Sequence, residues 1–151
     1  MSNTDFTPPN LGLDRNVAFQ MASIIYRLEQ DLRDSSLRKL DITYVHFRVL
    51  QYLLEEDGKP IGDIARAIVA KPAVFSRVID QMEQRSLVRR APDPDDNRLT
   101  RVYLTDSGRE KYAQAWPSAH RIINFALEVL TPQERESLET CLKKIGEHVC
   151  F

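Results

Sequence analysis

The stretch Arg85–Gly108, which reads RSLVRRAPDPDDNRLTRVYLTDSG, decides the fold of this chain. Two short runs of β-favouring residues, Leu87–Arg90 and Thr100–Leu104, flank a polar segment rich in proline and aspartate. This pattern predicts a β-hairpin with a long loop. Two strands of this length are not stable alone, so the hairpin is expected to pack against helices. It is either a connecting ribbon or a wing, meaning a hairpin that lies along nucleic acid with a basic residue at its tip.

Apolar residues with helical spacing lie on both sides of the hairpin. On the N-terminal side they predict four helices. The first begins near Asp14, the second follows the N-cap Thr43, the third covers Ile61–Ile68 and the fourth begins at Pro72. The fourth of these helices is expected to end at the hairpin.

On the C-terminal side two more helices are expected. Thr105 is a suitable N-cap for a long fifth helix, in which Pro117 removes one backbone hydrogen bond. Thr131 and Glu134 form a capping box that opens the sixth helix.

Two helices joined by a short turn and followed by a hairpin have the element order of a winged helix-turn-helix. We therefore predict a mainly α (α+β) fold with six helices and a two-stranded wing. Residues 43–104 form the expected DNA-binding domain. Residues 1–42 and 105–151 form the expected dimerisation region, because their apolar stripes exceed what one small winged domain can cover.

Composition and charge agree with a nucleic-acid-binding role. The chain has 151 residues, a net charge of −1 and no apolar run of membrane-spanning length. Residues 61–104 carry 8 − 6 = +2 charges and the remainder carries 13 − 16 = −3, so the basic charge gathers in the middle. The first ten residues show no secretion signal, and we expect a cytoplasmic protein without membrane association.

Enzyme and metal motifs are absent from the sequence. It has no glycine-rich phosphate loop, nucleophile elbow or clear acid–base pair, so we expect no catalytic residue and no cofactor. The three histidines and two cysteines lack metal-ligand spacing. Cys141 and Cys150 are expected to be reduced thiols, and a redox-responsive regulator that uses either of them is an alternative.

The chain resembles the MarR family of bacterial transcription regulators in the order and spacing of several motifs. These motifs are Ile42–Phe47, Ile64-Ala65, Ala73–Met82, Asp96-Asn97-Arg98 and Leu104–Gly108. The resemblance implies a homodimer, a winged domain in each subunit, a pseudo-palindromic operator in double-stranded DNA, and a small-molecule or oxidant input. Val69 and Ser86 stand where the family usually has glycine, and both positions are expected to need a positive φ.

The candidate DNA contacts lie at the start of the fourth helix and at the wing tip. Lys71, Ser76 and Arg77 supply polar or basic groups for base edges and phosphates, and Ala73 and Val74 supply methyl groups for thymine. Arg98 is expected to enter the minor groove.

Asp96 precedes Arg98 by two residues. We expect its carboxylate to hold the Arg98 guanidinium in a bidentate pair. The alternative for this tip is a solvated, charged loop.

The candidate ligand site consists of Tyr26, His46, Trp116 and His120. By the resemblance, their helices meet between the DNA-binding and dimerisation regions. Aromatic and histidine side chains there suit an aromatic acid, a phenol or an acyl-coenzyme A ester, although ordinary core and surface roles are an open alternative. The leading hypothesis is a homodimeric repressor that such a ligand releases from DNA. A winged-helix protein-interaction module is the other class.

Overall fold

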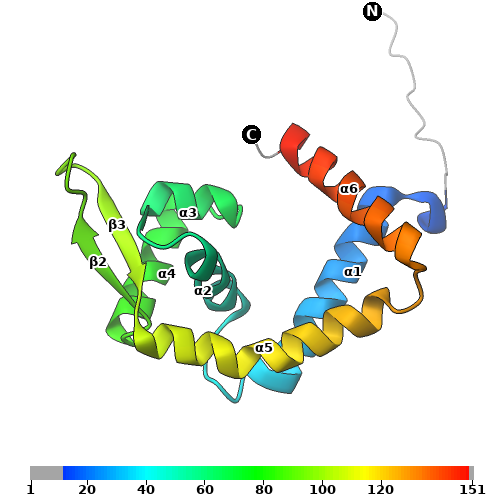
Figure 1. The fold of residues 1–151 in the computed structure, drawn as a ribbon, viewed down its shortest axis with the longest axis horizontal. Helices are drawn as coiled ribbons and strands as arrows, with labels where there is room; N and C mark the ends of the chain where they lie inside the picture. Colours follow the sequence, from blue (N-terminus) through cyan, green and yellow to red (C-terminus); the bar gives the residue numbers. More distant parts are fainter. Residues whose placement is uncertain (1–11, 150–151) are drawn as a thin grey trace, which may run out of the picture.

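The computed structural model describes residues 12–149, apart from the side chains of Pro72 and Ala73 (Figure 1). Six α-helices lie in this range: α1 (Val17–Leu32), α2 (Tyr44–Glu55), α3 (Ile61–Ala67), α4 (Pro72–Gln84), α5 (Asp106–Leu127) and α6 (Pro132–Val149). The strands are β1 (Lys59–Pro60), β2 (Val88–Pro92) and β3 (Thr100–Leu104). The mainly helical winged fold is confirmed.

The sheet has one more strand than the sequence predicted. The hairpin of β2 and β3 is antiparallel, with Arg90 opposite Val102. The short strand β1 pairs with the other edge of β3, so the order is β1-β3-β2. A two-residue strand that contains proline has no sequence signature of its own, because its conformation comes from pairing with β3.

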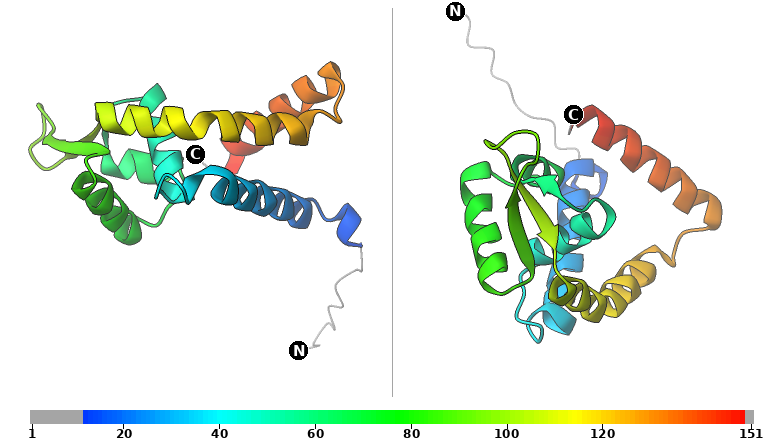
Figure 2. Two further views of the ribbon diagram at one scale, coloured as in Figure 1. Left: turned by 90° about the horizontal axis from the view of Figure 1, so that it is seen from below. Right: turned by 60° about the vertical axis from the view of Figure 1, so that its left-hand side comes forward.

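The molecule has two parts that α5 joins. Figure 1 shows α2, α3, α4 and the sheet at one end of the molecule and α1 and α6 at the other, with α5 running between them. Helix α1 contacts α5, and Figure 2 shows α6 folding back from the end of α5. Helix α1 continues into a π-helical segment, η2 (Arg33–Leu37), before the chain enters α2.

The buried core lies almost entirely in the winged part. Its largest fully buried side chains include Leu50, Leu53, Ile64, Phe75 and Ile79. Helix α6 has no buried residue within residues 132–149, and α1 has one, Leu32. Between residues 12 and 149, no helix is both long and apolar enough to cross a membrane.

Polar side chains cap the helices at the predicted residues. The hydroxyls of Thr43, Thr105 and Thr131 accept hydrogen bonds from the backbone N–H groups of the first helical turns of α2, α5 and α6. Each cap supplies a partner for an N–H that the helix leaves unbonded. The sequence therefore fixed where these helices begin.

The joint between the hairpin and α5 is closely packed. The Leu87 carbonyl accepts hydrogen bonds from the Thr105 backbone N–H at 3.3 Å and from the Thr105 hydroxyl at 2.9 Å. A Cβ atom on Gly108 would lie 2.1 Å from the same carbonyl oxygen. Only glycine lets the first turn of α5 approach β2 this closely.

Two turns have a left-handed backbone at the residues that stand where the family usually has glycine, as predicted. Val69, between α3 and α4, has φ 57°, and Ser86, between α4 and β2, also has φ 57°. Val69 is 75% exposed, so no burial of its side chain offsets the strain. A β-branched residue with positive φ is an outlier that costs free energy.

We expect Val69→Gly to raise the free energy of unfolding by about 1 kcal/mol, since a left-handed residue costs about 1–2 kcal/mol and the added chain entropy of glycine returns part of this gain. Urea unfolding measures the change. The matched control is Val45→Gly in α2, which should lower stability, because glycine is a poorer helix former than valine and the packing of a side chain that is 39% exposed is lost. A loss of stability on Val69→Gly would contradict the strain argument.

Candidate nucleic-acid interface

Helix α4 is the candidate recognition helix. Pro72 occupies its first turn, where the missing N–H leaves no bond unmade. Phe75, Ile79 and Met82 recur at helical spacing and are fully buried against the winged core. This anchoring leaves Val74 and Arg77 exposed on the outer side. The first turn carries no acidic residue, so the positive end of the helix dipole is not neutralised.

Two hydrogen bonds from backbone N–H groups to Asp96 shape the wing tip. Its Oδ1 accepts a hydrogen bond from the Arg98 backbone N–H at 2.9 Å, and its carbonyl accepts one from Leu99 N at 2.9 Å. The carboxylate thus holds the Arg98 amide, whereas the sequence predicted a pair with the guanidinium. A short side chain two residues upstream reaches the backbone of its own turn most easily. The Arg98 side chain is left exposed.

Asp93 anchors the base of the wing loop. Its Oδ1 accepts from Asp95 N at 2.9 Å and Asp96 N at 3.1 Å, and its Oδ2 accepts from Arg101 Nε at 2.5 Å. Arg101 also donates to the Gly58 carbonyl at 2.8 Å, which ties the loop to the turn before β1. Asp93 is only 3% exposed. The Asp95 amide and the Arg101 guanidinium hold the pKa of Asp93 below its usual range.

The eight cations of residues 61–104 differ in whether the described part of the chain supplies a partner for their charged group. Four arginines form ion pairs with carboxylates: Arg66, Arg85, Arg90 and Arg101. A fifth, Arg89, lies over the Tyr103 ring with 4.3 Å between its Cζ and the ring centre. Within residues 12–149, the structure gives the charged groups of the other three, Lys71, Arg77 and Arg98, no ion pair or hydrogen bond. All three are among the residues that the sequence predicted to contact DNA.

The predicted ligand residues are only partly brought together. The rings of Trp116 and His120 contact each other on α5 in a tilted arrangement, with ring centres 5.3 Å apart and 36° between their planes. They continue a series of aromatic contacts that starts in the core with Phe47 and Tyr112. Trp116 is 45% exposed, so the series reaches the surface there. His120 also lies beside the Asn124 amide, at 3.0 Å from Nε2.

His46 and Tyr26 lie elsewhere. His46 is 3% exposed and completes the capping box of α2, where its Nδ1 accepts a hydrogen bond from Thr43 N at 3.3 Å. Burial, aided by the charge of Arg85, lowers the pKa of His46, which favours the neutral ring that this bond requires. Tyr26 is 65% exposed on α1.

Ala73 and the two cysteines complete the set of residues that the sequence singled out. The side chain of Ala73 lies outside the described part of the chain, as does Cys150. Cys141 is a free, exposed thiol on α6.

Sequence reasoning missed two sets of fold contacts that shape the interface. Asp93 with Arg101 fixes the wing loop, and Arg90 fixes β2 against α4. The sequence shows these residues as members of a charge-rich stretch. Nothing in their spacing tells paired arginines from free ones, because the partners come from different elements.

The order of α3, α4 and the β2–β3 hairpin is that of a winged helix-turn-helix protein, a class that binds DNA. A family model described as "MarR family" matches residues 42–100. YkoM of Bacillus subtilis, described as an uncharacterized HTH-type transcriptional regulator, is 30% identical over 120 residues, which cover 80% of this chain and 77% of YkoM. This chain belongs to the MarR family and is a DNA-binding transcriptional regulator.

Solved structures agree with this assignment. A MarR family transcriptional regulator from Silicibacter pomeroyi is 30% identical, with a TM-score of 0.85, and the match covers 95% of this chain and 97% of that one. The repressor CouR bound to a 23-mer DNA duplex is 25% identical, with a TM-score of 0.78, and the match covers 93% and 99% of the two chains.

Asp93→Asn should lower the free energy of unfolding at neutral pH, since an amide cannot accept the three hydrogen bonds of the carboxylate. Because folding lowers the pKa of Asp93, its contribution is present above the ordinary carboxyl pKa of about 4 and is lost as the pH falls through the lowered value. The stability difference between the two proteins should therefore shrink in acid. Urea midpoints from pH 7 to pH 2 measure it.

Asp95→Asn, a substitution at the exposed neighbouring residue, is the control and should change stability little. A difference between wild type and Asp93→Asn that stays constant down to the lowest pH would contradict the role given to the Asp93 charge.

Proposed function

We propose that this regulator is a homodimeric repressor that binds a pseudo-palindromic operator through Lys71, Ala73, Val74, Ser76, Arg77, Asp96 and Arg98. The observation that carries the proposal is a set of three cations, Lys71, Arg77 and Arg98, whose charged groups have no ion pair or hydrogen bond among the described residues. An unpaired cation is available to a phosphate or a base, whereas a paired one must first lose its carboxylate. The three stand at the start of α4, on its exposed side and at the wing tip.

Each residue has a distinct role in this proposal. Lys71 and Arg77 contact phosphates or base edges in the major groove, where the first turns of α4 enter. Arg98 enters the minor groove, and Asp96 fixes the turn that presents it. Two recognition helices related by a two-fold axis read half-sites about one helical turn apart, roughly 10 base pairs.

We expect Arg98→Ala to weaken binding to a selected operator duplex by about 1–3 kcal/mol, the usual value of a good groove contact. Asp96→Ala should have a smaller effect in the same direction, because it loosens the turn and leaves the guanidinium in place. Fluorescence anisotropy at fixed salt measures both. Arg38→Ala, at an exposed arginine that pairs with Asp34 outside the interface, is the control. Unchanged affinity and salt slope for a folded Arg98→Ala would reject the wing contact.

The proposed dimer interface is formed by α1, α5 and α6. These helices expose large apolar side chains, among them Ile24 (55%), Ile25 (55%), Phe125 (71%), Leu142 (47%) and Ile145 (45%). A groove of about 650 Å³ between α1 and α5 is lined by Ile24, Leu28, Ile122 and Phe125, among others. Exposed apolar area of this extent on three neighbouring helices is the signature of an obligate subunit interface.

Light scattering at micromolar concentration should therefore give a mass of twice 17.4 kDa. Ile145→Glu places a charge on the exposed apolar face of α6 and should shift the mass towards the monomer. Lys144→Glu changes the charge of the adjacent residue on another face and should not. A folded wild-type monomer at these concentrations would overturn the proposed interface.

The proposed ligand is an aromatic acid, a phenol or an acyl-coenzyme A ester, and its binding releases the operator. The contact between Trp116 and His120 supports this, because it offers an exposed aromatic surface next to a group that can hydrogen-bond a carboxylate or phenol. Tyr26 lies apart from this pair on α1, and His46 is held in the α2 cap, so Trp116 and His120 are the residues on which the proposed ligand site rests. Because Trp116 lies on the helix that joins the two parts of the molecule, a ligand there can change the distance between the two recognition helices.

Trp116 fluorescence should change on titration with a panel of hydroxybenzoates, phenols and aroyl-coenzyme A esters. His120→Ala should weaken that response and leave operator binding without ligand nearly unchanged. A ligand that weakens DNA binding a hundredfold must favour the DNA-incompatible state by about 2.7 kcal/mol, and DNA must weaken ligand binding equally. Loss of DNA binding and of ligand response together in His120→Ala would show that His120 is structural.

A further inference from the structure

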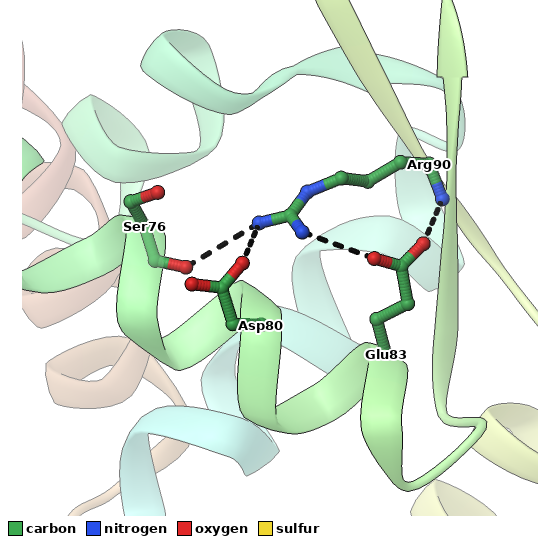
Figure 3. A network of polar contacts seen from close by, with 4 residues as sticks. All are labelled: Ser76, Asp80, Glu83 and Arg90. Carbon is green, nitrogen blue, oxygen red and sulfur yellow. Dashed lines mark hydrogen bonds and ion pairs between the residues drawn. The ribbon is translucent and has the colours of Figure 1, made fainter.

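Arg90 reaches from β2 across to the side of α4 (Figure 3). Its Nη1 donates to Glu83 Oε2 at 3.0 Å, and its Nη2 donates to Asp80 Oδ1 at 2.6 Å and to the Ser76 carbonyl at 3.4 Å. Its backbone N–H donates to Glu83 Oε1 at 2.9 Å. We call these four residues the Arg90 clamp.

The partners of Arg90 are spread along α4. Ser76, Asp80 and Glu83 follow i, i+4, i+7 spacing, so they lie on one side of the helix over two turns, a length of about 10 Å. A planar guanidinium with several fixed donors can hold acceptors at such separate points in one geometry. The clamp therefore restrains the direction of α4 as well as its distance from β2.

The clamp connects the two elements that are proposed to read DNA. Ser76 and Arg77 belong to the recognition helix, and β2 leads directly into the wing loop that carries Arg98. The buried face of α4 packs on the core through Phe75 and Ile79, which leaves rotation about the helix axis and tilt towards the wing to be fixed from the side. The Arg90 side chain is 24% exposed, so these ion pairs are partly shielded from solvent.

The geometry points to Arg90 as a positioning residue for sequence-specific DNA binding. Through Asp80 and Glu83, Arg90 fixes the recognition helix relative to the wing. This inference rests on the proposed DNA contacts of α4 and the wing. Sequence-specific binding needs both elements at a fixed separation, because the grooves of DNA are fixed. Binding to unrelated sequence needs only positive charge near phosphates. The clamp should therefore affect the ratio of specific to nonspecific affinity.

The experiment measures affinity for two labelled duplexes by fluorescence anisotropy at one salt concentration. One duplex is selected by the wild-type protein from a randomised pool, and the other is a shuffled duplex of the same composition. Thermal unfolding of each variant confirms that it is folded. The selected duplex makes no assumption about the natural operator.

Two variants separate positioning from simple electrostatics. Arg90→Lys keeps the charge but cannot hold three separate acceptors, so it should bind the selected duplex about tenfold more weakly, roughly the loss of one base contact, and leave the shuffled duplex within about twofold. Asp80→Ala/Glu83→Ala removes two negative charges and should bind the shuffled duplex more tightly. It should nevertheless lower the ratio of selected to shuffled affinity, because it releases Arg90.

The control is Asp95→Ala, which removes a wing-loop charge outside the clamp and should strengthen binding to both duplexes by the same factor. Wild-type affinity of Arg90→Lys for the selected duplex would overturn the proposal. So would an equal change on both duplexes for Asp80→Ala/Glu83→Ala, which decides the question even if the Arg90 variant does not fold. Failure of the DNA contacts themselves would appear differently, as wild-type behaviour of Arg98→Ala and of Arg77→Ala.

Discussion

The arrangement of this regulator depends on the close contact between the Leu87 carbonyl and the first turn of α5. Thr105 donates two hydrogen bonds to that carbonyl, and Gly108 leaves room for the approach. This joint ties the start of the wing to the helix that runs through both parts of the molecule. The joint therefore fixes the start of β2 closely against the first turn of α5.

Charge pairing decides which cations of the basic middle segment remain available for the proposed DNA contacts. Most of its arginines are used within the protein, where they hold the wing loop to β1 and β2 to α4. Isolated surface ion pairs contribute little to stability. Here the pairs join different elements, and their main effect is to fix geometry. The cations of this segment that have no ion pair within residues 12–149 and no ring contact lie in the first two turns of α4 and at the wing tip.

Helices outside the winged part carry apolar side chains that remain exposed. Helices α1 and α6 bury almost nothing within the described chain, yet they carry long apolar stripes. Such helices gain little from isolated helix formation and depend on packing for their stability. Their stripes support the proposed dimer. The rings of Trp116 and His120 lie on the helix that links this surface to the winged part.

The sequence by itself determined the helices, their caps and the hairpin, because periodicity and capping are local properties. It also identified Val69 and Ser86 as positions with positive φ, and it predicted Lys71, Arg77 and Arg98 as DNA contacts. It could not supply β1, which exists only through pairing with β3, or the partners of Arg90 and Arg101, which come from elements distant in the chain. It grouped His46 with Trp116 by residue type, whereas the tertiary structure buries His46 in a helix cap. Which charges are free and which aromatic rings are exposed depends on packing between elements, and only the tertiary structure decides that.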